Sequence, residues 1–322
     1  MSASPIDRKY RTLVLSAGAA SIATAGTLIA LKCGVWLYSG SSSMLASLTD
    51  SVLDLAASLV NLLALRFALT PPDRDHRFGH FKAEALASLS QAAFIGGSAF
   101  LLIFHGVARV KDPVPLELVD LGIYVSIASM VITVLLVSYQ AFVCKVTGSQ
   151  AVGADRYHYL SDLILNMGVI AALVLSNLGY LWADGLFAAI LGVFILKGSV
   201  HIALQAVATL LDRSLTPKEH EEIIKNLLEV QGVKSLHDLR TRKAGPQCFI
   251  QCHVVIDGKV TLKEAHEIAT RAENAVFKLY PDADVTIHME PDEAATYRDI
   301  QFYGRNDLQD NACSVVNRER LW

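Results

Sequence analysis

Residues 44–69, MLASLTDSVLDLAASLVNLLALRFAL, form an apolar stretch that contains two aspartates, Asp50 and Asp54. A helix of this length can cross a bilayer, which needs about 20 residues. Side chains four residues apart lie on the same face of a helix. Because ionisable groups inside a membrane are energetically expensive, they suggest a function. The stretch therefore predicts a spanning helix with two carboxylates on one face.

Five more apolar stretches of spanning length lie near residues 13–36, 83–107, 117–143, 155–177 and 182–208. Charge changes along the chain: residues 1–212 hold 26 of the Asp, Glu, Lys and Arg side chains, and residues 213–322 hold 33. The first part is therefore suited to lipid and the second to water. We expect an α-helical membrane protein with six transmembrane helices in residues 1–212.

The water-facing part predicts a small α+β domain in the order α-β-β-α-β over residues 213–290. Capping boxes that begin at Thr216 and Thr261 predict the starts of its two helices. Strands are predicted near residues 234–243, 247–257 and 285–290. Residues 291–322 are polar and irregular, which predicts a flexible C-terminal tail.

Lys and Arg are concentrated on one side of the predicted membrane. That side carries Arg8, Lys9, Arg11, Arg66, Arg74, Arg77, Lys82, Lys145 and Arg156. The short loops of the other side hold Arg109 and Lys111 alone. The excess of positive charge predicts that both termini are cytoplasmic.

Other classes of protein are disfavoured. A net charge of −3 argues against nucleic acid as a partner. The five cysteines are scattered, which predicts neither a disulfide framework nor a zinc site of cysteines alone. The sequence has no P-loop, nucleotide fingerprint or Ser-His-Asp order, so we do not expect an enzyme.

The first candidate metal site combines two spanning segments. Asp50 and Asp54 share one helix face, and His158 and Asp162 have the same spacing in the fifth segment. Three carboxylates and one imidazole can form a tetrahedral site, and Zn²⁺ suits such ligands. The alternative is that these groups face a polar crevice or pair with basic side chains.

The second candidate site is the loop after the second segment, where Asp73, His76 and His80 lie within eight residues. Two histidines and a carboxylate can bind a metal, although a flexible loop provides little preorganisation. A wet polar loop with a pH-sensitive surface explains the same residues.

The third candidate site lies in the α+β domain. His237, His253 and His288 fall on predicted strands, His266 falls on the second helix, and Glu290 lies on the same strand face as His288. Four histidines and a carboxylate could converge on a binuclear site. Each histidine alone is better explained as an ordinary half-buried side chain, whereas the set as a whole favours a metal site.

These residues resemble the cation diffusion facilitator family over about residues 10–290. The resemblance is carried by Ser43–Asp50 with Asp54, His76–His80 with Lys82–Glu84, Ala154–Asp162, and His237–Arg242. It implies a homodimer of six-helix protomers in the bacterial inner membrane, each with a metallochaperone-like cytoplasmic domain. It also implies that divalent metal is exported in exchange for protons. Zn²⁺ is the expected substrate and regulatory ligand, and Cd²⁺ and Fe²⁺ are further candidates.

In that pattern, the three clusters match a transport site, a loop site and a cytoplasmic binuclear site. Close relatives have a bridging Asp where this chain has Glu290. Lys82 and Asp212 match a pair that links the membrane helices to the cytoplasmic domain. The alternatives are a passive divalent-metal channel or uptake carrier, and a membrane-anchored metal sensor.

Overall fold

The computed structural model describes residues 8–39, 42–111, 120–178, 180, 182–293 and 302–304. It divides into two compact units. The helical unit ends at Leu210, and the mixed α/β unit begins at Leu211.

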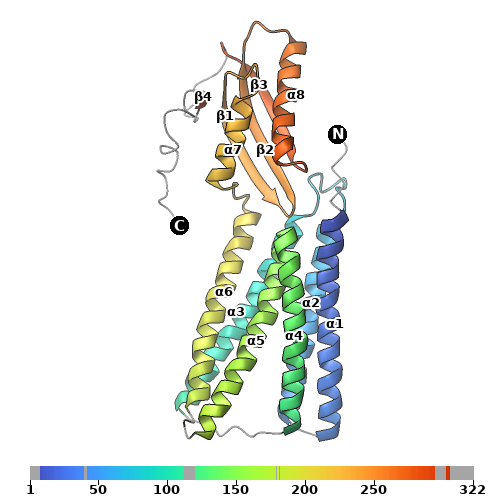
Figure 1. The fold of residues 1–322 in the computed structure, drawn as a ribbon, viewed down its shortest axis with the longest axis vertical. Helices are drawn as coiled ribbons and strands as arrows, with labels where there is room; N and C mark the ends of the chain where they lie inside the picture. The colour runs from blue at the N-terminus through green and yellow to red at the C-terminus, as the bar shows by residue number, and fades with distance from the viewer. Residues whose placement is uncertain are drawn as a thin grey trace. The chain divides into compact units, whose positions relative to one another are not determined.

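Six long helices form the described part of the helical unit, as the sequence predicts (Figure 1). They are α1 Arg8–Ser39, α2 Ser42–Ala68, α3 Lys82–Lys111, α4 Asp120–Thr147, α5 Gln150–Asn177 and α6 Ala183–Leu210. Within the described residues, α1, α2, α3, α4 and α6 have the length and hydropathy of membrane-spanning helices. α5 is the helix that carries Asp155, Arg156 and Asp162, and it begins five residues earlier than the apolar pattern predicts.

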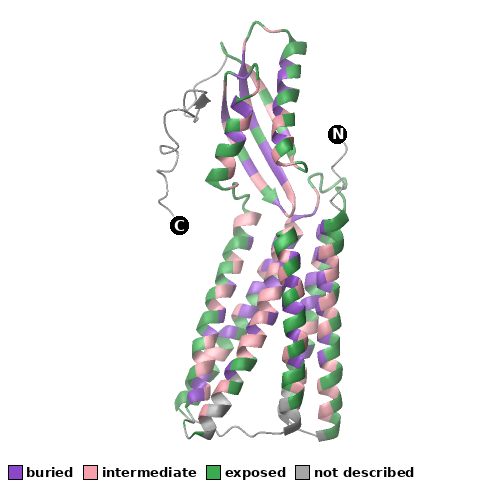
Figure 2. Cartoon of the chain, viewed as in Figure 1, coloured by how far each residue is buried: buried purple, intermediate pink, exposed green. Residues whose placement is uncertain are grey.

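The outer sides of these helices are apolar and exposed, whereas the sides that face one another are buried (Figure 2). Phe104, Leu135 and Phe194 are each more than half exposed. A large exposed apolar surface is typical of a protein that contacts lipid.

Glycines set the spacing between α3 and α6. A Cβ atom added at Gly106 of α3 would lie 2.6 Å from the backbone nitrogen of Ala189 in α6. One added at Gly185 of α6 would lie 2.6 Å from the backbone nitrogen of Val110. Because only glycine permits such close backbones, α3 and α6 form a tight pair. The helices α1, α2, α4 and α5 pack with one another beside it.

The α/β unit follows the predicted order α-β-β-α-β. Its elements are α7 Pro217–Leu228, β1 Ser235–Ala244, β2 Gln247–Ile256, α8 Leu262–Leu279, β3 Asp284–Pro291 and β4 Phe302–Gly304. The sheet order is β3-β2-β1-β4, with β1 antiparallel to β2 and β2 parallel to β3. Both predicted capping boxes are present, at Thr216 and Thr261.

The core of this unit lies between its two helices and one face of the sheet (Figure 1). Leu227 of α7 and Val276 of α8 are fully buried in one cluster with Leu236, Ile250 and Val254 of the strands. Successive strand residues point to opposite faces, so the residues between these apolar ones lie on the other face.

One strand lies where an irregular tail is expected. β4 pairs antiparallel with β1, and its three residues lie opposite Ser235, Leu236 and His237. The edge of a sheet presents unpaired backbone N–H and C=O groups, so the short segment gains backbone hydrogen bonds that its composition does not reveal. The rest of the predicted tail after residue 293 lies outside the described residues.

Candidate metal sites

His158 of α5 lies between carboxylates from two helices. Its Nε2 is 3.1 Å from Oδ1 of Asp54 on α2 and 3.8 Å from Oδ2 of Asp162, one turn further along α5. One ligand atom from each residue lies within 4.8 Å of the others. Zn²⁺ bonds of about 2.0–2.2 Å place the ligand atoms of a tetrahedral site roughly 3.4 Å apart. The cluster therefore has the spacing of a dication site.

Asp50, the fourth predicted ligand, is exposed on α2 and is not a member of this group. It lies one turn before Asp54. Lys32 of α1 donates hydrogen bonds to the hydroxyl of Ser51 and to a backbone carbonyl. In the described part of the chain, the ion pair of Asp54 is with His158. Asp54 is thus part of the candidate metal cluster, whereas Asp50 lies outside it in this structure.

A second acidic residue of α5 fixes this helix in place. Asp155 is 1% exposed, and its Oδ2 accepts hydrogen bonds from Ser21 of α1 at 2.5 Å and Gln140 of α4 at 2.8 Å. Four residues later, the hydroxyl of Tyr159 lies 2.9 Å from that of Ser58 in α2. Hydrogen bonds to α1, α2 and α4 therefore flank His158 along the chain.

A further buried carboxylate, Glu84, ties the start of α3 to two other helices. It accepts hydrogen bonds from Tyr10 of α1 at 2.8 Å and from Ser149, just before α5, at 2.5 Å. Neither Asp155 nor Glu84 could be given a role from the sequence. The available signal was an acidic residue in an apolar segment, which by itself does not identify hydrogen-bond partners.

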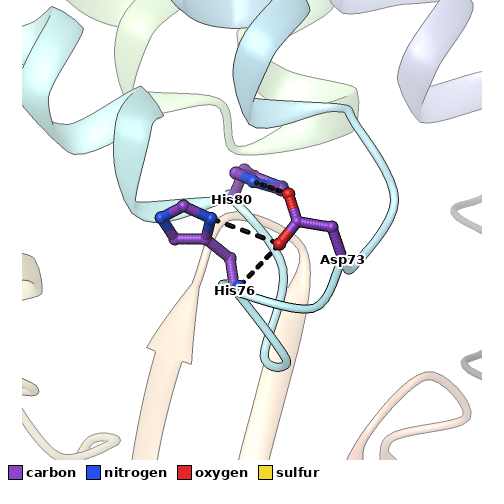
Figure 3. A group of neighbouring side chains, drawn as sticks. All are labelled: Asp73, His76 and His80. Atoms are coloured by element: carbon purple, nitrogen blue, oxygen red, sulfur yellow. Dashed lines mark hydrogen bonds and ion pairs between the residues drawn. The ribbon is translucent and has the colours of Figure 1, made fainter.

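The loop between α2 and α3 holds the second group (Figure 3). The two carboxylate oxygens of Asp73 lie 3.3 Å from Nδ1 of His76 and 3.2 Å from Nε2 of His80. His80 is buried, with its side chain 3% exposed, whereas that of Asp73 is 53% exposed. Nδ1 of His80 lies 3.4 Å from the carbonyl oxygen of Thr70. Because a carbonyl only accepts, this contact leaves Nε2 for a metal.

The loop is more ordered than the sequence predicts. Backbone amides of Asp75 and His76 donate to Oδ1 of Asp73, at 2.9 and 2.6 Å. The bond from His76, followed by that from Asp75, holds the pKa of Asp73 below its usual range. Gly79 has a φ of 81°, a left-handed conformation that glycine adopts without strain. These local bonds preorganise the carboxylate between the two imidazoles.

Three histidines of the α/β unit form a row across the sheet. His237 of β1 is the Cα partner of His253 in β2, and His253 is the partner of His288 in β3. Neighbouring ring centroids are 4.9 and 4.7 Å apart. Directly opposed residues share a face, so the alternation of each strand brings the row together.

Glu290 connects the members of this row. Its Oε2 lies 3.1 Å from Nε2 of His237, and its Oε1 lies 2.7 Å from Nδ1 of His253 and 3.7 Å from Nε2 of His288. Partial burial raises the pKa of Glu290, but hydrogen bonds from His253 and His237 outweigh this effect and hold it below the usual range. The glutamate therefore reaches two strands at once. His266 is exposed on α8 and does not join the group within one chain.

Lys82 and Asp212, which the family resemblance links as a pair, each form a hydrogen bond with another partner that the sequence did not predict. Lys82 donates to the carbonyl of Leu210 at 3.3 Å. Asp212 has a φ of 57° and accepts from Arg242 at 3.2 Å. The Arg242 guanidinium also lies 4.5 Å from the ring centroid of Phe249.

Two family models match the chain. One is described as the cation efflux transmembrane domain and matches residues 19–211, and the other, the cation efflux protein cytoplasmic domain, matches residues 215–292. Three relatives are named cation-efflux pump FieF. The protein from Shewanella oneidensis is 47% identical over 88% of this chain and 96% of its own length. Those from Pectobacterium atrosepticum and Klebsiella pneumoniae are 45% and 41% identical over 88% and 93% of this chain, and 94% and 100% of their own.

A solved structure of the metal-bound C-terminal domain of the CzcD transporter from Thermotoga maritima is 30% identical to this chain. The match covers 26% of this chain and 100% of that domain, with a TM-score of 0.24.

Proposed function

This chain belongs to the cation efflux family of divalent-metal transporters, and we propose that it works as a proton-coupled antiporter that exports Zn²⁺ from the cytoplasm. The observation that carries the proposal is the cluster of Asp54, His158 and Asp162 inside the helical unit. The cluster joins α2 to α5, so its occupancy acts on the packing of two helices.

Proton coupling follows from the chemistry of these ligands. Metal ligands must be deprotonated to bind, and Nε2 of His158 lies within hydrogen-bond distance of Asp54. A proton shared there occupies the position that a metal would take. Cytoplasmic metal displaces protons when the site faces inward, and external protons displace the metal after reorientation. An inward proton gradient then drives metal outward.

The donor set supports Zn²⁺ as the substrate. One imidazole with carboxylates suits Zn²⁺ and Cd²⁺ and tolerates Fe²⁺. Relatives carry the name cation-efflux pump, which is consistent with export.

The histidine row with Glu290 is proposed as a regulatory site. Metal held there favours one arrangement of a homodimer and shifts the population of transport states. The match of residues 215–292 to a cytoplasmic-domain family model supports a regulatory role for the α/β unit beside transport by the helical unit. We also propose the bacterial inner membrane as the location, with both termini cytoplasmic, because Lys and Arg concentrate on that side of the helices.

The proposal is tested in proteoliposomes loaded with Zn²⁺, with and without a pH gradient, and repeated with Cd²⁺ and Fe²⁺. Asp54→Ala and Asp162→Ala are expected to abolish metal-dependent proton flux. Asp184→Ala removes a carboxylate of α6 outside the cluster and serves as the control. Full antiport in either cluster variant would overturn the assignment. Metal flux that is the same with and without the pH gradient would favour a channel or uptake carrier. The absence of metal flux would favour a membrane-anchored sensor.

A further inference from the structure

A cavity of about 330 Å³ lies within the helical unit, and none of its lining residues belongs to the metal cluster. Its walls come from the end of α4, the start of α5 and the end of α6, with Ser88 of α3, so it lies near one end of the helices. Its polar side chains are those of Ser88, Cys144, Ser149, Gln150, Arg156, Tyr157 and Gln205. A cavity of this size can hold a small ligand.

The charged group of this cavity is Arg156. Its Nε is buried and has no hydrogen-bond partner among the described residues. The ion pairs of the described chain also do not include it. The nearby carboxylates, Asp155 and Glu84, accept from neutral donors instead. Arg156 is therefore a half-buried cation whose Nε has no partner and which forms no ion pair within the described residues.

A cation with an unpaired, buried Nε in the wall of a cavity is a candidate ligand-binding group. A metal ion is a poor occupant, because Arg156 repels it and the cavity walls contain neither histidine nor carboxylate. An anion would neutralise the charge of the Arg156 guanidinium and accept hydrogen bonds from it. The planar fork of a guanidinium matches two oxygens of a phosphate, so a phosphate ester is the best-matched ligand.

The position favours a lipid as the source of that phosphate. Arg156 lies six residues after the start of α5, which is roughly 9 Å along the helix axis. This is near the end of α5 that the proposed orientation puts at the cytoplasmic face, where lipid headgroups lie. On α6, Leu204 and Val207 flank Gln205 and are 64% and 37% exposed, which gives acyl chains an apolar surface beside the cavity. We propose that the cavity binds the phosphate headgroup of an anionic phospholipid, with Arg156 as its counter-charge.

Cys144 makes the cavity observable in the unmodified protein. It is half-buried and lines the cavity, whereas Cys33 of α1 is half-buried elsewhere. The full chain in detergent is treated with a maleimide, and modification of each cysteine is followed by peptide mass spectrometry. Phosphatidylglycerol is expected to slow modification of Cys144 and to leave Cys33 unchanged. Equal rates at Cys144 with and without this lipid would overturn the proposal.

Two further arms identify the ligand and the residue. Phosphatidylcholine and inorganic phosphate are each tested in place of phosphatidylglycerol. Protection by inorganic phosphate at the same concentration would replace the lipid with a free anion, and equal protection by phosphatidylcholine would remove the role of net charge. Arg156→Gln is expected to bind phosphatidylglycerol about fivefold more weakly. Lys145→Gln removes an exposed cation of α4 outside the cavity and should bind like the wild type.

If Arg156→Gln does not fold, Arg156→Lys keeps the charge without the fork. It should bind phosphatidylglycerol more weakly than the wild type but still more tightly than phosphatidylcholine. Unchanged affinity in the Gln or the Lys variant would contradict the role of Arg156. None of these measurements requires transport, so they are independent of the proposed antiport.

Discussion

Replacing Gly106 by alanine should separate α3 from α6. The new Cβ would lie 2.6 Å from the backbone nitrogen of Ala189 and 2.8 Å from the carbonyl oxygen of Gly185. Ordinary contacts of a Cβ are about 3.4–4 Å, so the helices must move apart by roughly 1 Å. Backbone atoms cannot rotate away as a side chain can. Overpacking of this kind costs about 1–3 kcal/mol.

Gly97 provides a matched control on the same helix. A Cβ added there meets no atom within 4 Å. Alanine is a better helix former than glycine by about 1 kcal/mol at both positions. That gain cancels in the comparison, so the difference between Gly106→Ala and Gly97→Ala measures the clash alone.

The assay is thermal unfolding of both variants in the same detergent. For a domain of this size, 1 kcal/mol shifts Tm by about 2–4 °C. Gly106→Ala should therefore melt about 2–12 °C below Gly97→Ala. If the two variants melt together, or if Gly106→Ala is the more stable, the tight α3–α6 pair is not a feature of the folded protein.

Two further predictions concern the α/β unit. Burial lowers the pKa of His220, whose Nε2 lies 2.6 Å from the Thr241 hydroxyl. The unfolded chain therefore binds the proton first, and the unit loses stability as the pH falls below about 6.5. Hydrogen-exchange protection factors in α7 and β1, corrected for the intrinsic rate at each pH, should fall on acidification less in His220→Gln than in the wild type, and an equal fall would contradict the role of His220. Joint replacement of His237 and His288 by alanine should change the apparent metal affinity of transport in proteoliposomes more than its maximal rate, whereas complete loss of transport would show that the row is not modulatory.

The six helices and the order of the α/β unit could be predicted because each depends on local pattern. Long apolar segments indicate spanning helices, and the capping boxes at Thr216 and Thr261 indicate where α7 and α8 begin. The neighbourhood of His288 and Glu290 could also be predicted, because residues two apart on one strand share a face. The register that aligns His237, His253 and His288 could not, since it depends on long-range pairing.

The hydrogen-bond partners of the buried acids could not be predicted from the sequence. Asp155 meets Ser21 and Gln140, which are 134 and 15 residues away along the chain. Their contact depends on how α1 and α4 pack against α5, and no periodicity reports it. The loop differs for another reason: the turn that orders Asp73 is local, but it consists of hydrogen bonds to backbone amides, which ligand spacing does not reveal.

Burial differs between the three candidate metal clusters in a way that supports the separate roles proposed for them. In each, a carboxylate already contacts one or more imidazoles, so metal must replace contacts between its own ligands, and acid weakens all three sites. At the first cluster, His158 is 13% exposed and both acids come from membrane helices. Asp54 and Asp162 are 24% and 36% exposed, so the imidazole is the most enclosed ligand of the proposed transport site. In the loop, Asp73 is half exposed, so metal can come and go without a change in helix packing. The row lies between these limits, with His237 3% and His288 64% exposed, which fits a site that both senses metal and alters protein packing.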